Sequence, residues 1–431
     1  MVCRDFSGRR VAEAKTPIMF AILRLIGGLF FLCLASLTLI QPPTRGLWAA
    51  SVAATEWGYW LALAAMVVLI PTRGNPRLGR MGALMTLCAM ALFLIPVIRA
   101  KQLNTTLPPL LEARFGPAER QRNDFAQPPR PEPLNLAELL HPLETPPIRY
   151  EERVFATHDG QELSLTVYRP AYVHGAVPAV LVVHGGTWRD GDRHEFGPFN
   201  AYLASRDYVV VSMDYRLAPK WPFPAARNDV LAAVAYLKVY ASELNIDPNR
   251  IALIGRSGGA QLALLSAYTA HEPSIRGVVS LYGPSDLRFE YDNPGPPKVS
   301  DSRAAIEAYL GGAPGDSTNS VYYAASPLNF VSASSPPSLL VHGDRDPIVS
   351  ADHASRLEER LLQAGVKHFV VRLPWATHGC DKSFGGPCGQ IVTYAVERFL
   401  DSVLAGPKMP KAETSRGRTA SVHTKGAKKG G

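Results

Sequence analysis

The sequence of 431 residues is long enough for one large domain and a second unit, and 47% of its residues are hydrophobic. The formal net charge of +8 does not indicate a nucleic-acid-binding face, because seven Lys and Arg residues and a single acidic residue lie after Ala405. Five cysteines are too few for a disulfide framework, and their spacing indicates no zinc site. We therefore expect no metal, no nucleic-acid partner, and a basic disordered tail over residues 405–431 that could also contact anionic lipid.

Three apolar runs dominate the first hundred residues: Pro17–Ile40, Leu47–Ile70 and Met81–Ile98. Each is long enough to cross a hydrocarbon layer of about 30 Å. The alternative is a cleaved signal peptide followed by buried core helices. The first run, however, is longer than a typical signal core and no clear small-x-small site ends it. We predict a three-helix transmembrane anchor over residues 1–98.

The basic residues around these runs predict an orientation. On one side of the membrane we place the N-terminus and the loop between the second and third runs, with Arg4, Arg9, Arg10, Lys15, Arg73, Arg77 and Arg80. The other side has Arg45, Arg99, Lys101 and Arg114. The larger cluster favours the cytoplasm, so the chain after Ile98 is expected outside it. Arg24 would then extend to the cytoplasmic head groups.

Residues 99–147 are rich in proline and charge, which predicts a linker with a short helix near 134–140. From residue 148 the chain alternates between strand and helix patterns. Alternation over 149–156 and 162–168 predicts an antiparallel pair, and continuous apolar runs follow at 179–183, 208–212, 250–254, 277–281 and 338–341. Helical stretches lie between them. We predict an α/β fold with a mostly parallel, doubly wound sheet over residues 148–404 and a small cap insertion at about 286–330.

A Gly-x-Ser-x-Gly sequence is centred on Ser257, between a strand that ends at Ile254 and a helix that follows Gly259. A serine at such a sharp turn is lifted above the sheet, and the N–H of the next residue points to where an oxyanion would form. The alternative is a glycine-rich connection with a bystander serine. The catalytic interpretation requires an acid, a base and an oxyanion hole elsewhere in the sequence.

An acid and a base follow Ser257 in the chain order that this chemistry uses. The strand 338–341 leads into His342-Gly343-Asp344-Arg345-Asp346, in which Asp346 is favoured as the acid and Asp344 competes with it. His378 follows the last strand, 369–373, and is the expected base.

The strand 179–183 ends in His184-Gly185-Gly186-Thr187-Trp188. Consecutive glycines allow backbone N–H groups to face a carbonyl oxygen without a Cβ in the way. We expect Gly185, Gly186 and Gly258 to form an oxyanion hole, and His184 to brace this loop.

Five ordered motifs, His184-Gly-Gly-Thr-Trp, Asp214-Tyr-Arg-Leu-Ala-Pro, Gly255-Arg-Ser-Gly-Gly, His342-Gly-Asp-Arg-Asp and His378-Gly, resemble the α/β-hydrolase fold. More narrowly, residues 148–404 resemble esterases related to hormone-sensitive lipase and to the carboxylesterase/feruloyl-esterase-like group. The resemblance implies a triad of Ser257, Asp346 and His378, hydrolysis of carboxylic esters and no cofactor. Two departures stand out: Gly258 replaces a frequent alanine, and the loop after His184 has two glycines rather than three.

Other residues keep two interpretations. Trp188 and Tyr282 are candidates for substrate binding, although core packing explains both equally well. Asp214, Tyr215, Arg216 and Asp229 could form walls of the substrate pocket, but a buried polar knot that fixes the neighbouring loops is favoured. Cys380 and Cys388 could close a disulfide loop beside His378 or be unrelated thiols.

These patterns together predict a membrane-anchored serine esterase in the cell membrane, with its catalytic domain outside the cytoplasm and a small-molecule or lipid ester as substrate. An amidase, peptidase or lipid deacylase could use the same triad. A membrane-tethered binding protein with a relict hydrolase fold is the non-catalytic alternative.

Overall fold

The computed structural model describes residues 7–71, 75–118, 120, 122, 126–141, 148–170, 172 and 175–406, and of residues 7–17 it describes the backbone only. The predicted basic tail lies, except for its first two residues, outside the described part of the chain. So do Arg4, Arg73 and the side chains of Arg9, Arg10 and Lys15, on which the predicted orientation depends.

Eight strands form one sheet in the order β1-β2-β4-β3-β5-β6-β7-β8. They are β1 (Ile148–His158), β2 (Gln161–Pro170), β3 (Val177–Val183), β4 (Val209–Met213), β5 (Ile246–Arg256), β6 (Ile275–Leu281), β7 (Ser338–Gly343) and β8 (His368–Leu373). The first two strands are antiparallel to each other, and β2 pairs antiparallel with β4. All pairs from β4 to β8 are parallel. Their apolar runs are buried because helices cover both faces.

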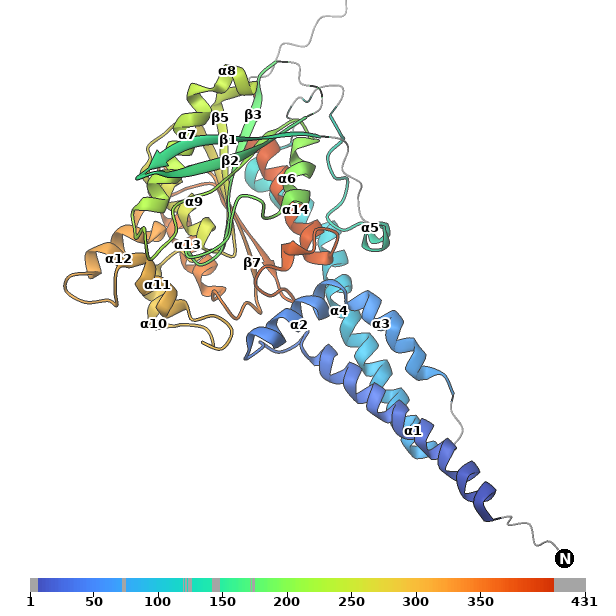
Figure 1. Cartoon of the computed structure of the whole chain (residues 1–431). Coiled ribbons are helices and arrows are strands. Elements are labelled where there is room, and N and C mark those ends of the chain that lie inside the picture. Colours follow the sequence, from blue (N-terminus) through green and yellow to red (C-terminus); the bar gives the residue numbers. More distant parts are fainter. Residues whose placement is uncertain are drawn as a thin grey trace, which may run out of the picture.

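Two layers of helix sandwich this sheet (Figure 1). One layer contains α7 (Ala225–Val239), α9 (Gly258–Thr269) and α13 (Asp352–Gln363), with the short α8 (Ala241–Leu244) at its edge. The other contains α6 (Gly197–Ala204) and α14 (Pro387–Val403). The prediction of an α/β fold with a mostly parallel sheet is confirmed.

The stretch predicted as a cap lies between β6 and β7. It contains α10 (Leu287–Asp292), α11 (Ser302–Leu310), α12 (Asn319–Ala325) and the 3-10 helix η2 (Pro327–Phe330). Asp286 and Asp301 accept hydrogen bonds from first-turn N–H groups of α10 and α11, which explains where these two helices begin.

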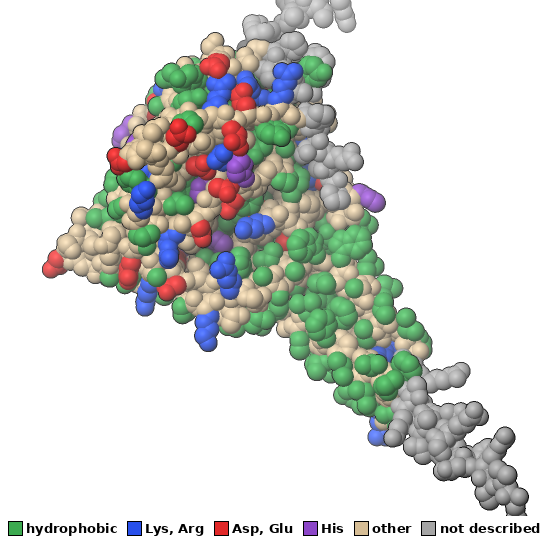
Figure 2. All heavy atoms as spheres, viewed as in Figure 1, with side chains coloured by type: hydrophobic (Ala, Val, Ile, Leu, Met, Phe, Trp, Pro, Cys, Tyr) green, Lys and Arg blue, Asp and Glu red, His purple; other side chains and the backbone are tan. Residues whose placement is uncertain are grey.

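Two long apolar helices leave the α/β domain (Figure 1). They are α1 (Ser7–Ser36) and α4 (Pro76–Phe115), and each is long and apolar enough to cross a membrane. Large apolar side chains are exposed along both, among them Leu23, Phe30, Leu84 and Ile98. Figure 2 shows the hydrophobic side chains gathered on this stem, whereas charged side chains are scattered over the α/β domain.

The second predicted span is broken, which corrects the prediction of three transmembrane helices. It forms α2 (Arg45–Glu56) and then α3 (Gly58–Ala65) with the 3-10 helix η1 (Met66–Leu69), and the two parts are bent by 83°. The buried carboxylate of Glu56 accepts the N–H of Cys388 over 2.9 Å, which draws the end of α2 toward the α/β domain. A Cβ at Gly58 would lie 2.5 Å from the carbonyl oxygen of Phe93, so α3 starts in close contact with α4. Among the described residues, two helices rather than three could each span a membrane unbroken.

Arg24, which was expected to extend to the head groups, has hydrogen-bond partners on a neighbouring helix. Its guanidinium donates to the carbonyl oxygens of Val68 and Leu69, over 2.8 and 2.9 Å. These carbonyls lie at the end of η1, where a helix leaves its last acceptors without partners. Arg24 is therefore paired within the helix bundle.

Much of the stretch predicted as a linker packs on the α/β domain instead of standing apart from it. After α4, Arg120 forms an ion pair with Asp401 over 3.2 Å, and the backbone N–H of Arg130 donates to Glu397 over 2.9 Å. Both carboxylates lie on α14 and are fully buried, so they require partners of this kind. A short helix, α5 (Leu136–Leu140), follows close to the predicted position.

Candidate active site

Ser257 lies at a strained turn between β5 and α9, with φ of 52° and ψ of −123°. A Cβ at Gly255 would lie 2.2 Å from the carbonyl oxygen of Gly259, and a Cβ at Gly259 would lie 2.1 Å from that of His184. Both glycines of the motif are therefore required by backbone contacts. The second contact also joins the turn at Ser257 to the loop after β3.

The structure brings Ser257, His378 and Asp346 into one hydrogen-bonded chain. His378 Nε2 lies 3.0 Å from Ser257 Oγ, and His378 Nδ1 lies 2.7 Å from Asp346 Oδ2. All three residues are more than nine-tenths buried. With the proton on Nδ1 donated to the carboxylate, Nε2 is free to accept the serine proton.

Asp346 is held as a carboxylate by its surroundings. Its Oδ1 accepts the N–H groups of Ile348 and Val349, over 2.8 and 3.0 Å, and His342 Nε2 lies 3.4 Å from Oδ2. Burial alone would raise the pKa of Asp346, but the charge of His378 and the hydrogen bonds from His342 and His378 lower it below its ordinary value. Asp346 thus stays ionised opposite the imidazole.

Asp344, the competing acid, points elsewhere. It is partly exposed and forms an ion pair with Arg372, whose Nη2 lies 2.6 Å from Asp344 Oδ1. Of the two carboxylates, only Asp346 contacts His378 in the structure.

The three glycines proposed for the oxyanion hole surround Ser257. Gly185 and Gly186 line the same cavity as Ser257, and Gly258 is the first residue of α9. N–H groups in the first turn of a helix have no acceptor within the helix. A Cβ built on Gly185 would lie 3.5 Å from Ser257 Cβ, which shows how closely this loop approaches the serine.

His184 braces the glycine loop, as expected. Its ring stacks on that of Tyr215 with centroids 4.1 Å apart, and the Tyr215 hydroxyl donates to the carbonyl oxygen of Gly185 over 3.0 Å. Burial lowers the pKa of His184, so its imidazole is neutral at neutral pH. The expected polar knot is present in part, since Arg216 donates to both carboxylate oxygens of the buried Asp229, whereas Asp214 pairs with Arg193 over 2.6 Å instead.

For Trp188 the structure favours core packing over substrate binding, the two interpretations that the sequence left open. Its indole is buried, stacks on Tyr309 with centroids 4.6 Å apart, and donates to Gln261 over 2.9 Å. Trp188 therefore belongs to the core behind Gly258, and packing is the better explanation for it. Tyr282 does line the cavity, and its ring lies 4.6 Å from that of His378.

Sequence reasoning missed a buried network beneath the catalytic loop. Arg256 Nε donates to Asp381 Oδ2 over 2.7 Å, and the Tyr282 hydroxyl donates to Asp381 Oδ1 over 2.5 Å. The guanidinium also lies over the ring of Phe196 at 3.5 Å. A charged residue at the end of an otherwise apolar strand was the available signal, because it requires a buried partner.

Cys380 and Cys388 are joined by a disulfide, eight positions apart. The bridge closes the loop that begins two residues after His378. Glu56 contacts the same loop through the N–H of Cys388. The structure therefore contains the disulfide loop, which was one of the two interpretations of these cysteines.

Residues of the apolar N-terminal region also reach the site, which nothing in the sequence indicated. Trp48 and Arg45 line the cavity of about 690 Å³ that contains Ser257 and His378. Trp48 Nε1 donates to the carbonyl oxygen of His378 over 3.3 Å.

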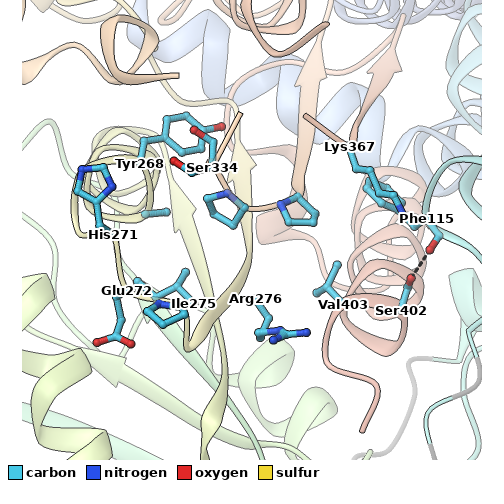
Figure 3. Close-up of a pocket in the computed structure, with 15 residues that line it drawn as sticks. Phe115, Tyr268, His271, Glu272, Ile275, Arg276, Ser334, Lys367, Ser402 and Val403 are labelled. Atoms are coloured by element: carbon cyan, nitrogen blue, oxygen red, sulfur yellow. Dashed lines mark hydrogen bonds between the residues drawn. The ribbon is translucent and has the colours of Figure 1, made fainter. Parts of the chain in front are cut away.

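A second hollow, of about 600 Å³, lies apart from this site (Figure 3). Its labelled side chains include His271, Glu272, Arg276 and Lys367, and the Ser402 hydroxyl donates to the carbonyl oxygen of Phe115 over 2.6 Å at its edge. Ser257 and His378 line the other cavity, which is therefore the candidate active site.

Comparison with known proteins places the chain among esterases. The family described as BD-FAE matches residues 165–361. Carboxylesterase NlhH of Mycobacterium tuberculosis is 30% identical over 256 residues, which cover 56% of this chain and 79% of that protein. Esterase LipC of the same organism is 30% identical over 240 residues, or 52% of this chain, and the chain spans only 58% of that relative's length.

Two solved structures of esterases are also similar to this chain. A bacterial heroin esterase superposes with a TM-score of 0.55 at 26% identity, over 63% of this chain and 89% of that one. The thermostable carboxylesterase EstE1 superposes with a TM-score of 0.53 at 26% identity, over 61% of this chain and 92% of that one. The uncovered part of this chain is larger than the uncovered part of either structure.

Proposed function

Because the chain belongs to the family of carboxylic ester hydrolases with an α/β-hydrolase fold, we propose that it cleaves carboxylic esters with Ser257 as nucleophile, His378 as base and Asp346 as orienting carboxylate. The observation that carries this proposal is the hydrogen-bonded chain from Ser257 Oγ through His378 to Asp346, with distances of 3.0 and 2.7 Å. It supports general-base activation of the serine, since the base lies within reach of the proton it removes.

In the first step, Ser257 Oγ attacks the carbonyl carbon of the ester while its proton passes to His378 Nε2. The C=O electron pair moves to the oxygen, and the N–H groups of Gly185, Gly186 and Gly258 stabilise the resulting negative charge. When this tetrahedral intermediate collapses, the bond to the alkoxy group breaks and His378 gives its proton to the departing alcohol. The acyl group remains on Ser257.

In the second step, His378 removes a proton from water, and the hydroxide attacks the acyl carbonyl. Collapse of this intermediate returns the proton to Ser257 Oγ and releases the carboxylic acid. Asp346 remains ionised throughout and holds the imidazole by its Nδ1 proton, in keeping with its lowered pKa. No cofactor takes part in either step.

Our proposal for the domain plan is an anchor over 1–98, a connecting segment over 99–147, a catalytic domain over 148–404 with a cap at about 286–330, and a tail after it. The apolar surfaces of α1 and α4 support membrane insertion. In this proposal the shorter α3 and η1, which pack on α1 and α4, lead the chain back across the stem, so that the N-terminus and the catalytic domain lie on opposite sides. The basic residues flanking the apolar runs favour a catalytic domain outside the cytoplasm. The disulfide between Cys380 and Cys388 supports the same side, because such bonds persist in oxidising compartments.

The test of the chemistry compares the full chain with two serine variants. Ser257→Ala is expected to lose hydrolysis of short-chain aryl esters and labelling by a fluorophosphonate probe. Ser266→Ala, at another buried serine on α9, is the matched control and is expected to keep both. Labelling of Ser257→Ala at the level of the control would refute the proposal.

The test of topology uses intact cells that express the chain. A membrane-impermeant fluorophosphonate is expected to label Ser257 before lysis as fully as after it. Labelling that requires lysis would place the catalytic domain in the cytoplasm and contradict the proposed orientation, while leaving the proposed chemistry intact.

A further inference from the structure

The segment that includes α2 contacts the two loops that present His378 and Asp346. Trp48 Nε1 donates to the carbonyl oxygen of His378, and Gln41 Nε2 donates to that of Asp346, both over 3.3 Å. These pairs are 330 and 305 positions apart in the chain. The N-terminal region is therefore built into the active site and does not act only as a tether.

The same segment forms one wall of the catalytic cavity. Arg45 and Trp48 line it together with Ser257 and His378. The backbone N–H of Arg45 donates to the carbonyl oxygen of Lys298 over 2.9 Å, which closes the wall against the cap. A substrate on Ser257 consequently lies directly beside α2.

In the proposed membrane anchor, the direction of α2 puts this wall at the membrane surface. Figure 1 shows α1, α3 and α4 side by side in the stem, and α2 crossing between the stem and the α/β domain. Because α2 is bent by 83° from α3, it lies nearly parallel to a membrane that the stem crosses. Its exposed Leu47 and the neighbouring Trp57, which is 49% exposed, suit the boundary between lipid and water.

The lining of the cavity is mixed: Asp190, Glu195 and Asp301 line it together with apolar and cationic groups. Val299 and Ile348 lie on its wall with Trp48 and can receive a hydrocarbon chain. Arg45 and Lys298 are exposed on the same wall, where they would meet the polar head groups of a bilayer. An ester with both an apolar chain and a polar group would match these two kinds of residue.

We propose that the enzyme takes its ester from the bilayer: its substrate class is an amphiphilic ester whose acyl chain passes beside α2 into the cavity, and Trp48 selects for that chain. This inference rests on the proposed function and adds to it the physical state of the substrate. It requires the cavity wall formed by α2 to discriminate between esters held in lipid and esters dissolved in water.

The experiment uses the full chain in phosphatidylcholine vesicles with two fluorogenic esters, umbelliferyl palmitate in the bilayer and umbelliferyl acetate in the water. Added phosphatidylcholine, at constant ester and protein, dilutes the palmitate within the bilayer. The palmitate rate is expected to fall in proportion to its mole fraction in the lipid, while the acetate rate stays constant. A palmitate rate that follows only the total concentration would overturn the inference.

Variants then test the wall itself. Trp48→Ala is expected to lower kcat/KM for the palmitate about tenfold more than for the acetate, since it removes a large apolar contact with the chain. Trp48→Phe keeps an aromatic ring and should restore most of that ratio. Trp221→Ala is the matched control, because Trp221 is half-buried and donates its indole N–H to Gln161 away from the cavity. It should leave the ratio unchanged.

An equal loss on both esters in Trp48→Ala would show that Trp48 only supports His378, and would overturn the selection by Trp48. These results differ from a failure of the proposed function itself. That failure would appear as full hydrolysis of both esters by Ser257→Ala.

Discussion

Arg256, which immediately precedes Ser257, forms a buried ion pair with Asp381, which lies three residues after His378. The distance from Arg256 Nε to Asp381 Oδ2 is 2.7 Å, and the two side chains are 1% and 3% exposed. Since Tyr282 donates to the other carboxylate oxygen, Asp381 fastens the nucleophile strand to the histidine loop. The position of His378 over Ser257 therefore depends on a contact outside the triad.

Replacing Asp381 should impair both stability and catalysis. Asp381→Ala leaves the Arg256 guanidinium buried without a counter-charge, which typically costs about 3–5 kcal/mol. We expect a large fall in the free energy of unfolding, and a fall in kcat as His378 loses its position. Denaturant unfolding and ester hydrolysis by the folded fraction measure the two effects.

The control for this prediction is Asp344→Ala. Asp344 and Arg372 form a pair near the same end of the sheet, but both are more than a third exposed, so the loss should be about 0–1 kcal/mol. If Asp381→Ala and Asp344→Ala destabilised the protein equally, burial of the ion pair would not explain the loss of stability in Asp381→Ala.

Removing the disulfide should loosen the loop after His378. Cys380→Ser/Cys388→Ser frees a short loop in the unfolded chain, for which the loss of stability is about 2–3 kcal/mol. We expect a lower Tm, a lower kcat and no further response to reductant. Cys33→Ser/Cys88→Ser is the control, because these free cysteines lie exposed on α1 and α4. If reductant left the Tm and the activity of the unmutated chain unchanged, the loop would not need its bridge.

Asp346 should make stability depend on pH in a defined direction. Its pKa in the folded chain lies below the unfolded value of about 4, so the carboxylate stabilises the fold above that pH. This contribution is lost as the pH falls through the folded-state pKa. The Tm difference between the unmutated chain and Asp346→Asn should therefore be largest at neutral pH and shrink in acid. A difference that grew on acidification would have the wrong sign.

Adding one methyl group at the serine turn should be destabilising. Gly255→Ala and Gly259→Ala each place a Cβ within 2.2 Å of a backbone oxygen, and overpacking of this kind costs about 1–3 kcal/mol or more. Gly197→Ala is the control, since nothing lies within 4 Å of the Cβ position at the start of α6. Thermal unfolding and probe labelling of Ser257 compare the three variants, and equal Tm values would contradict the prediction.

The fold of the α/β domain was predictable because its signals are local. Each parallel strand is a short apolar run, and burial on both faces requires such a run wherever it lies. The order of Ser257, Asp346 and His378 along the chain was likewise readable, because each follows its own strand. The sequence alone did not decide whether Asp344 or Asp346 is the acid. The structure decides it, because Asp344 pairs with Arg372 whereas Asp346 contacts His378.

The break in the N-terminal region could not be predicted from local sequence patterns. Hydropathy over 47–70 is that of a single span, yet the chain breaks at Trp57, since Glu56 bonds to Cys388 and Gly58 packs on Phe93. Each of these contacts joins residues that are distant in sequence, so no local pattern reveals them.

By itself, then, the sequence determined a parallel α/β sheet, a strained serine turn and apolar runs long enough to cross a membrane, because periodicity and small residues at fixed spacing encode these directly. Only the tertiary structure decided that Arg256 pairs with Asp381, that Trp188 is a core residue, and that Trp48 lies against His378. The physical reason is the same in each case. A buried charge or indole N–H must find a partner, and which partner it finds depends on how distant segments pack together.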